Sequence, residues 1–148
     1  MPKVIFQNEE TSVYLFTNID EPNHNSKAMI RAALREYITR QPLDSCVKPI
    51  TVHWNKSDSH TYCVIACSQK RVGVDIEYMR ERPYEKLSKR WFDPAEVTDD
   101  MEIFYDIWCQ KEAHTKWKKE RLAKNIRKVV DKPMTPLKDL PDNVVGYL

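Results

Sequence analysis

The sequence predicts an α+β fold built on an antiparallel sheet. In the first half, short segments rich in strand-forming residues are separated by brief polar turns, and such short connections favour antiparallel pairing. From about residue 83 the apolar residues instead recur at helical spacing. A chain of 148 residues is long enough to bury a substantial core, so we expect a single domain spanning 1–148.

The first half, about 1–71, is expected to combine a hairpin, one helix and further strands. The predicted strands of this half are residues 3–7, 12–17, 50–54 and 60–67. A further strand, residues 72–78, is predicted at the start of the second half. Asn25 or Ser26 is suited to cap a helix that runs to about Arg40, because Pro42 follows its end. The polar residues 55–59 predict a turn.

The second half, about 72–148, is expected to be mainly helical. Residues 84–92 have helical spacing, and Asp93-Pro94 opens another helical turn with proline at its first position. A long helix follows from Glu102 onward, and its apolar stripe resumes at Leu122. The prolines after residue 128 predict an irregular segment, with a final strand at 144–148.

Composition limits the possible functions. The net charge of +2 is too small to indicate a nucleic-acid-binding protein, and no apolar run has the roughly 18–20 residues of a membrane span. Residues 1–6 lack the zones of a secretory signal, so we expect a cytoplasmic protein with reduced, buried cysteines. The histidines and cysteines lack zinc-site spacing, and no P-loop or Rossmann fingerprint is present.

One segment is strongly basic. Its cations are Lys111, Lys116, Lys118, Lys119, Arg121, Lys124, Arg127 and Lys128. The simpler interpretation is a solvated helix face. The alternative is a surface for an anionic ligand or an acidic partner protein, because clustered positive charge accelerates encounters with such partners.

Three carboxylates carry the strongest chemical signal. Asp75 and Glu77 lie two apart in a predicted strand, so their side chains share one face. Glu112 and Lys116 lie near the apolar face of the long helix. Each signal alone has a simple structural interpretation: a solvated strand end, and a helical ion pair worth about 0.2–0.5 kcal/mol. Together, three carboxylates suit Mg²⁺ and neighbouring lysines suit phosphate.

These residues lie in three sequence blocks that resemble those of a known family. The blocks are Val72-Gly73-Val74-Asp75-Ile76-Glu77, Arg90-Trp91-Phe92-Asp93-Pro94-Ala95-Glu96 and Trp108-Cys109-Gln110-Lys111-Glu112-Ala113-His114-Thr115-Lys116. They are similar to the G-[VI]-D-x-E, R-F-F-x-x-x-E and W-x-x-K-E-[AS]-x-x-K motifs of the 4'-phosphopantetheinyl transferases, particularly the surfactin-synthetase-activating type. The order and spacing of the blocks also match.

The resemblance implies a fold and a reaction. The expected fold is a 4'-phosphopantetheinyl transferase-like pair of pseudo-symmetric α/β halves, here compressed to about 1–71 and 72–148. Asp75, Glu77 and Glu112 would be the Mg²⁺ ligands. The reaction would move 4'-phosphopantetheine from coenzyme A to a serine of an acyl or peptidyl carrier protein, releasing adenosine 3',5'-bisphosphate.

The resemblance also implies catalytic and coenzyme-binding roles. Glu112 would accept the serine proton and Lys116 would stabilise phosphoryl charge, with Lys111 as a third contributor. Lys48, in Val47-Lys48-Pro49, would contact the 3'-phosphate of coenzyme A. The remaining predicted coenzyme contacts are Ser57, Ser59 and His60.

One position departs from the family pattern. Asp58 stands where the family's N-[IVL]-S-H-S-[GD] element has a histidine, and a carboxylate there would repel the 3'-phosphate. This departure and the short proline-rich end of the chain favour an alternative, a degenerate member that serves as a binding or assembly partner. A small nucleic-acid-binding domain that uses the basic segment is a third hypothesis.

The aromatic residues admit two interpretations. Trp91, Phe92 and Trp117 would form a docking surface for the carrier protein, with nearby basic side chains meeting its acidic helix. Alternatively, Trp91 and Phe92 belong to the core.

Overall fold

The structure is a computed structural model, and it describes residues 2–19, 25–41 and 51–148. Its helices and strands are β1 Lys3–Gln7, β2 Thr11–Phe16, α1 Ser26–Thr39, β3 His53–Ser59, β4 Tyr62–Ser68, β5 Asp75–Tyr78, α2 Tyr84–Trp91, α3 Met101–Lys118, α4 Leu122–Asn125 and β6 Val144–Tyr147, with a 3₁₀ helix at Pro94–Glu96. The predicted α+β class and antiparallel pairing are confirmed. In the described ranges, every helix is too short or too polar to cross a membrane.

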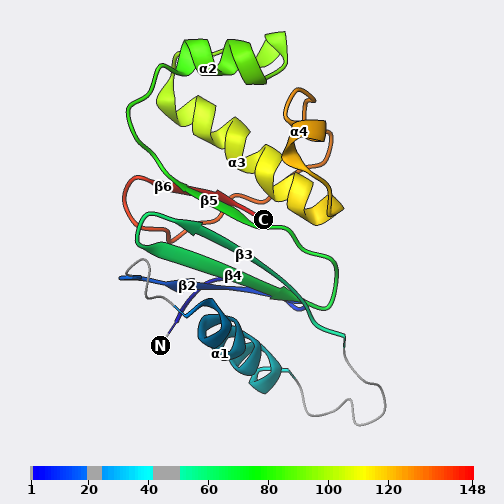
Figure 1. Cartoon of the computed structure of the whole chain (residues 1–148). Helices are drawn as coiled ribbons and strands as arrows, with labels where there is room; N and C mark the ends of the chain where they lie inside the picture. Colours follow the sequence, from blue (N-terminus) through cyan, green and yellow to red (C-terminus); the bar gives the residue numbers. More distant parts are fainter. Residues whose placement is uncertain (1, 20–24, 42–50) are drawn as a thin grey trace.

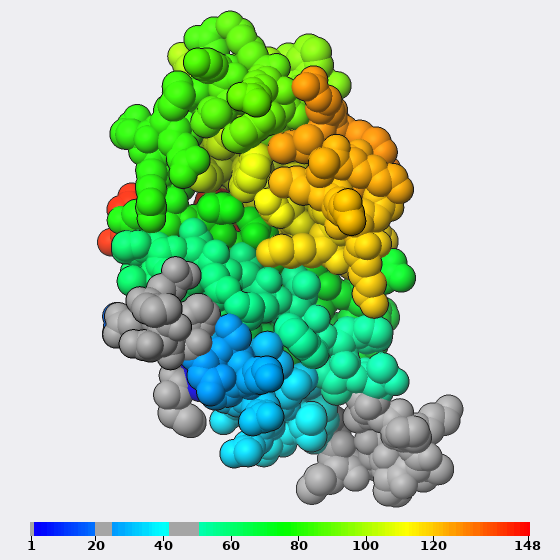
Figure 2. Space-filling model, in the orientation of Figure 1, coloured from blue at the N-terminus to red at the C-terminus, as the bar shows by residue number. Residues whose placement is uncertain are grey.

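The elements form layers (Figure 1). A four-stranded sheet has the order β1-β2-β4-β3, and a second sheet consists of β5 and β6. Helix α1 covers one face of the larger sheet, while the smaller sheet lies between the larger sheet and α3 (Figure 1). The space-filling view shows the surface of β3 between that of α1 and that of α3 and α4 (Figure 2).

Alternation along the central strands produces two cores, because successive side chains of a strand point to opposite faces. Toward α1, Tyr14, Cys63, Ile65 and Cys67 pack with the helix. Toward the smaller sheet, the buried cluster contains Ile5, Val13, Leu15, Val64, Ala66, Val74, Ile76 and Leu137. Cys63 and Cys67 are therefore buried on one face, which confirms for both the prediction of buried cysteines.

Helices α2 and α3 share an aromatic cluster. Tyr84, Phe92, Phe104 and Tyr105 form its buried part, and Phe92 stacks on Phe104 with ring centroids 5.0 Å apart. Phe92 is only 2% exposed, so it belongs to the core and not to an exposed docking surface.

Two boundary predictions were wrong. Residues 55–59 continue strand β3 instead of forming a turn, and their alternate polar side chains accept hydrogen bonds from backbone N–H groups of residues 74, 76 and 78, outside the sheet of β3. The chain reverses at His60, whose φ is 55°. The long helix ends at Lys118, where Lys119 adopts the left-handed conformation with φ 58°. Leu122 therefore begins a separate short helix, α4.

Candidate active site

The predicted carboxylates of β5 face one side of α3. Trp108, Glu112 and Lys116 are spaced four residues apart and so share a helix face. Trp108 contacts Glu77 at one end of this line, and Lys116 contacts Asp75 at the other. Strand and helix thus run in opposite directions, and Glu112 lies between the two contacts.

Asp75 is the most buried carboxylate of the group, at 4% exposure. Its Oδ1 accepts hydrogen bonds from the Ser57 hydroxyl at 2.9 Å and from Lys116 Nζ at 3.0 Å. Its Oδ2 is also buried but has no hydrogen-bond partner among the described residues. Burial raises the pKa of Asp75, and Lys116 opposes that shift.

Glu77 and Glu112 are shifted in the same direction. Burial raises the pKa of Glu77 to about 7, with a further contribution from the charge of Asp75, while the hydrogen bond from Trp108 Nε1, at 3.1 Å, opposes the shift. Burial and the charge of Asp75 also raise the pKa of Glu112. The three carboxylates therefore repel one another electrostatically within a partly desolvated site.

This site has the charge and donor set that suit a divalent cation. Lys116 is the one cation that forms an ion pair with any of the three carboxylates in the described ranges, so ionisation of all three leaves two negative charges. The unpartnered Asp75 Oδ2 offers a hard oxygen donor, which Mg²⁺ prefers. No group of three His, Cys, Asp or Glu side chains in those ranges is close enough to hold a metal ion as it stands.

Strand β3 fastens the two sheets together through its side chains. Asn55 Oδ1, Ser57 Oγ and Ser59 Oγ accept hydrogen bonds from the backbone N–H groups of Val74, Ile76 and Tyr78, at 2.9, 3.1 and 2.9 Å. Because alternate residues of both strands are used, the three bonds form a regular ladder. The hydroxyls of Ser57 and Ser59, predicted coenzyme contacts, thus help to position β5.

The remaining residues considered for coenzyme binding are His60, Asp58 and Lys48. The ring of His60 packs against that of Tyr78, with centroids 4.4 Å apart. Asp58 is exposed on β3 and pairs with Lys56. Lys48 lies outside the described residues.

Lys111 is not brought together with the carboxylates. It is 1% exposed, and its Nζ donates to Glu96 Oε1 at 2.7 Å and to the carbonyl oxygen of Lys128 at 2.5 Å. Its ammonium also lies 5.2 Å from the centre of the Phe92 ring. These contacts join two of the matched blocks and anchor the segment after α4.

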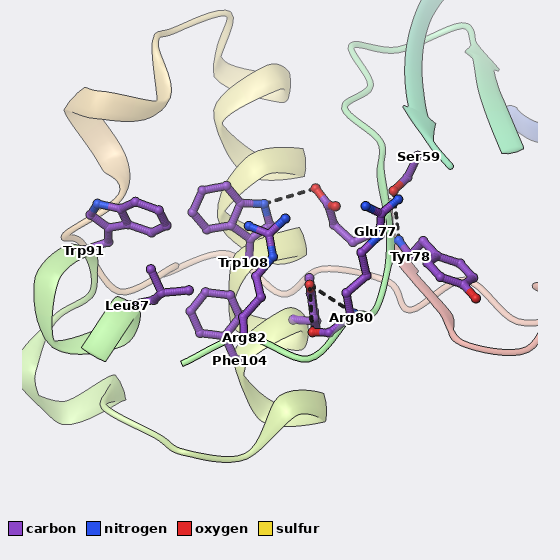
Figure 3. Close-up of a pocket in the computed structure, with 10 residues that line it drawn as sticks. Ser59, Glu77, Tyr78, Arg80, Arg82, Leu87, Trp91, Phe104 and Trp108 are labelled. Carbon is purple, nitrogen blue, oxygen red and sulfur yellow. Dashed lines mark hydrogen bonds between the residues drawn. The ribbon is translucent and has the colours of Figure 1, made fainter. Parts of the chain in front are cut away.

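A cavity of about 330 Å³ opens beside Glu77 (Figure 3). Its apolar wall is supplied by α2 and α3, through Leu87, Trp91, Phe104 and Trp108. Arg80 and Arg82 extend into it from the loop that follows β5 (Figure 3). No sequence pattern indicated these two arginines, because a loop has no periodic pattern that predicts where its side chains point.

Trp108 is a further residue of the site whose role the sequence patterns did not indicate. Its position four residues before Glu112 was the available signal, since that spacing places both on one helix face. The indole now lines the cavity and bonds to Glu77. Trp91 packs against Trp108, with ring centroids 5.5 Å apart.

Known proteins share the segment that forms this site. Residues 71–136 match the model of the 4'-phosphopantetheinyl transferase superfamily. A protein of Synechocystis, provisionally named a 4'-phosphopantetheinyl transferase, is 32% identical over 101 residues, which cover 61% of this chain and 41% of that protein. The 4'-phosphopantetheinyl transferase of Bacillus subtilis is 33% identical over 73 residues, covering 44% and 32%.

The matched regions thus make up less than half the length of either relative. The family match includes every carboxylate of the site together with Lys116. It confirms the resemblance indicated by the sequence blocks at the level of the superfamily. Over residues 71–136, this chain is similar to the 4'-phosphopantetheinyl transferases.

Proposed function

We propose that the chain carries the active site of a cytoplasmic, Mg²⁺-dependent 4'-phosphopantetheinyl transferase of the surfactin-synthetase-activating type. The reaction transfers 4'-phosphopantetheine from coenzyme A to a serine of an acyl or peptidyl carrier protein and releases adenosine 3',5'-bisphosphate. Such carriers serve fatty acid, polyketide or nonribosomal peptide synthesis. The observation that carries the proposal is the cluster formed by the buried Asp75 and the half-buried Glu77 and Glu112 beside Lys116.

In this proposal the three carboxylates hold the metal ion. Bound there, Mg²⁺ would neutralise charge on the coenzyme A diphosphate as the bond to the leaving group breaks. The protein's own contribution is to hold the ligands in place. Ser57 fixes Asp75 from β3, and Trp108 fixes Glu77 from α3. Such outer contacts orient metal ligands and keep them available.

Glu112 is the proposed general base. It lies one helical turn before Lys116 on the face of α3 that contacts β5, and its carboxylate would accept the proton of the carrier serine, directly or through a water molecule. Lys116 is the proposed electrostatic catalyst. Its ammonium is held by Asp75 and by the Val74 carbonyl oxygen at 3.0 Å, and it is only partly buried. The Lys56 carbonyl oxygen lies 3.4 Å from the same ammonium, so Lys116 is held in place, and its positive charge would stabilise negative charge on the phosphoryl group.

The cavity beside Glu77 gives the carrier protein a place to approach. Arg80 and Arg82 are exposed cations at this cavity, and in the described ranges neither forms an ion pair with a carboxylate. An acidic helix of a carrier protein would complement them. Because this docking is electrostatic, its rate should fall as salt is raised.

Intact-mass spectrometry of an apo carrier protein tests the proposal. With coenzyme A, Mg²⁺ and this protein, the carrier should gain about 340 Da, and the gain should vanish on chelation of the metal. Glu112→Gln should abolish the gain while the protein stays folded. Glu102→Gln, at an exposed position in the first turn of the same helix, is the matched control and should retain it.

A second candidate function is a degenerate member that binds a partner without efficient transfer. Asp58 favours this candidate, since its carboxylate stands where the family pattern has a histidine for the 3'-phosphate. Calorimetry with coenzyme A separates the two. Binding without transfer to any of several carriers would support the second candidate, and Asp58→His should then strengthen coenzyme binding.

A further inference from the structure

A second cavity, of about 220 Å³, lies at the C-terminal end of α3. It is bounded by the end of β4, the segment that leads into β5, and residues 132–135. Trp117 contributes the aromatic wall, and Arg71 and Lys132 contribute exposed cations. None of these three side chains belongs to the carboxylate site.

Two cationic side chains, Arg71 and Lys132, lie over the Trp117 ring. Lys132 Nζ lies 3.5 Å from the ring centre, and the guanidinium carbon of Arg71 lies 5.7 Å from it. Cation–π attraction accounts for both positions. Within the described ranges neither cation forms an ion pair with a carboxylate. By contrast, the neighbouring Lys70 is matched by Glu10 at 3.0 Å. The cavity therefore retains an excess of positive charge.

The aromatic wall is held by the fold independently of these cations. A Cβ atom at Gly73 would lie 2.2 Å from the Ala113 carbonyl oxygen and 2.5 Å from the Trp117 backbone nitrogen, so the segment that leads into β5 packs directly against the backbone of α3. The His114 ring also stacks on Trp117, with centroids 5.9 Å apart and planes 11° apart. Trp117 thus provides a fixed surface on which Arg71 and Lys132 are positioned.

Two hydroxyl-bearing side chains also line the cavity. Thr11 Oγ1 and Ser68 Oγ line the cavity and lie 2.7 Å apart within hydrogen-bond distance of each other. A pair of hydroxyls can rotate so that one donates to a ligand while accepting from the other. The cavity therefore combines an arginine fork, a lysine ammonium and one hydroxyl donor around a small volume.

We propose that this cavity binds a phosphate group, either as free phosphate or as a phosphate monoester, between Arg71 and Lys132. A doubly charged tetrahedral anion would neutralise both cations, which otherwise repel each other. The guanidinium offers two parallel donors that fit phosphate oxygens, and the ammonium adds a point charge. Trp117 then forms an apolar floor that limits hydration of the two contacts.

Titration with inorganic phosphate at constant ionic strength tests the proposal. Calorimetry and tryptophan fluorescence should show saturable binding, and constant ionic strength removes the general effect of screening. Arg71→Gln and Lys132→Gln should each weaken binding roughly tenfold, because each removes one charge-assisted contact. Lys86→Gln removes an exposed lysine from α2 and is the matched control that should bind as the wild type does.

Arg71 and Lys132 are both exposed and should tolerate glutamine, and circular dichroism checks that each variant is folded. Trp117→Phe separates signal from binding, since it should abolish the fluorescence change while calorimetry still detects the anion. Absence of saturable binding, or equal binding by the Lys132 and Lys86 variants, would overturn the proposal. Because inorganic phosphate is the first probe, the result does not depend on phosphopantetheine transfer.

A second titration distinguishes the source of the phosphate. Adenosine 3',5'-bisphosphate, the product of the proposed reaction, is titrated into wild type and Lys132→Gln without Mg²⁺. A weaker affinity in the variant assigns the cavity to phosphate monoesters. An unchanged affinity, together with weakened binding of inorganic phosphate, assigns it to free phosphate. Loss of neither affinity in the variant refutes the site.

Discussion

The Ser57 hydroxyl donates to Asp75 Oδ1 at 2.9 Å and, at the same time, accepts the backbone N–H of Ile76 at 3.1 Å. One side chain of β3 thus fixes both the backbone of β5 and the carboxylate that β5 presents to α3. The position of Asp75 therefore depends on the contact between the two sheets. Lys116 of α3 donates the second hydrogen bond to the same carboxylate oxygen.

Ser57→Ala should destabilise the fold and weaken the metal site together. It leaves Asp75 with one fewer donor and leaves the buried Ile76 N–H without an acceptor, at a cost of about 1–3 kcal/mol in the free energy of unfolding. Urea unfolding measures that cost. Ser59→Ala is the control, since Ser59 accepts only the Tyr78 N–H in a less buried setting and should cost less. Equal, negligible costs would contradict the joint role of Ser57.

Local sequence patterns predicted which face the carboxylates share, but they did not predict which side chains surround them. Asp75 and Glu77 follow strand alternation, and Glu112 and Lys116 follow helical spacing, so local periodicity is enough to place each pair on one face. Residues 55–59 were misjudged because asparagine and serine favour turns. In the folded chain those side chains accept backbone N–H groups from β5, a partner that no local pattern reveals.

The same limit explains Lys111. Its place in the matched block suggested chemistry, whereas its burial and its contacts with Glu96 and the Lys128 carbonyl depend on how α3 packs against distant segments. Arg80 and Arg82 lie in a loop, where sequence spacing does not predict direction. The helix predicted from periodicity also extended beyond the end of α3. Lys119 ends the helix in the left-handed conformation, and no glycine at this position indicates the end in the sequence.

Trp108→Phe should weaken Mg²⁺ binding while largely preserving the packing of α3. Phenylalanine keeps an aromatic ring but lacks the N–H that donates to Glu77, so the carboxylate loses its orienting contact. Loss of such an outer contact typically weakens metal binding about 10-fold or more. The measurement is the Mg²⁺ dissociation constant of each protein, obtained by calorimetric titration.

Trp91→Phe is the control for that measurement. Trp91 lines the same cavity and packs on Trp108, so the substitution perturbs the aromatic wall without touching Glu77. Its Mg²⁺ response should match that of the wild type. If the two variants respond alike, the hydrogen bond to Glu77 has no special part in metal binding.

The metal-free protein should lose stability as pH rises toward neutrality. The pKa of Glu77 is raised from 4.5 to about 7 in the folded protein, so the folded state binds its proton more tightly than the unfolded state does. The stabilising contribution is complete below about pH 4.5 and is lost as pH rises through about 7. Asp75 and Glu112 are shifted in the same direction.

Urea unfolding in the presence of a chelator, between about pH 5 and pH 7.5, measures this dependence. Glu77→Gln cannot titrate at that position and should show a shallower fall than the wild type. The difference between the two proteins isolates the contribution of Glu77. Identical slopes would show that Glu77 is not shifted. Added Mg²⁺ should reduce the wild-type fall, because the bound cation favours the ionised carboxylate.

Lys111→Met should reduce stability more than catalysis. The substitution leaves Glu96 as a largely buried carboxylate without its cation and removes a donor from the Lys128 carbonyl, at a cost of about 3–5 kcal/mol. Urea unfolding measures that cost, and Lys124→Met, at an exposed ion pair, is the control. Transfer activity per folded molecule should be retained at a temperature where the variant is folded. Loss of transfer with wild-type stability would instead identify Lys111 as a catalytic residue.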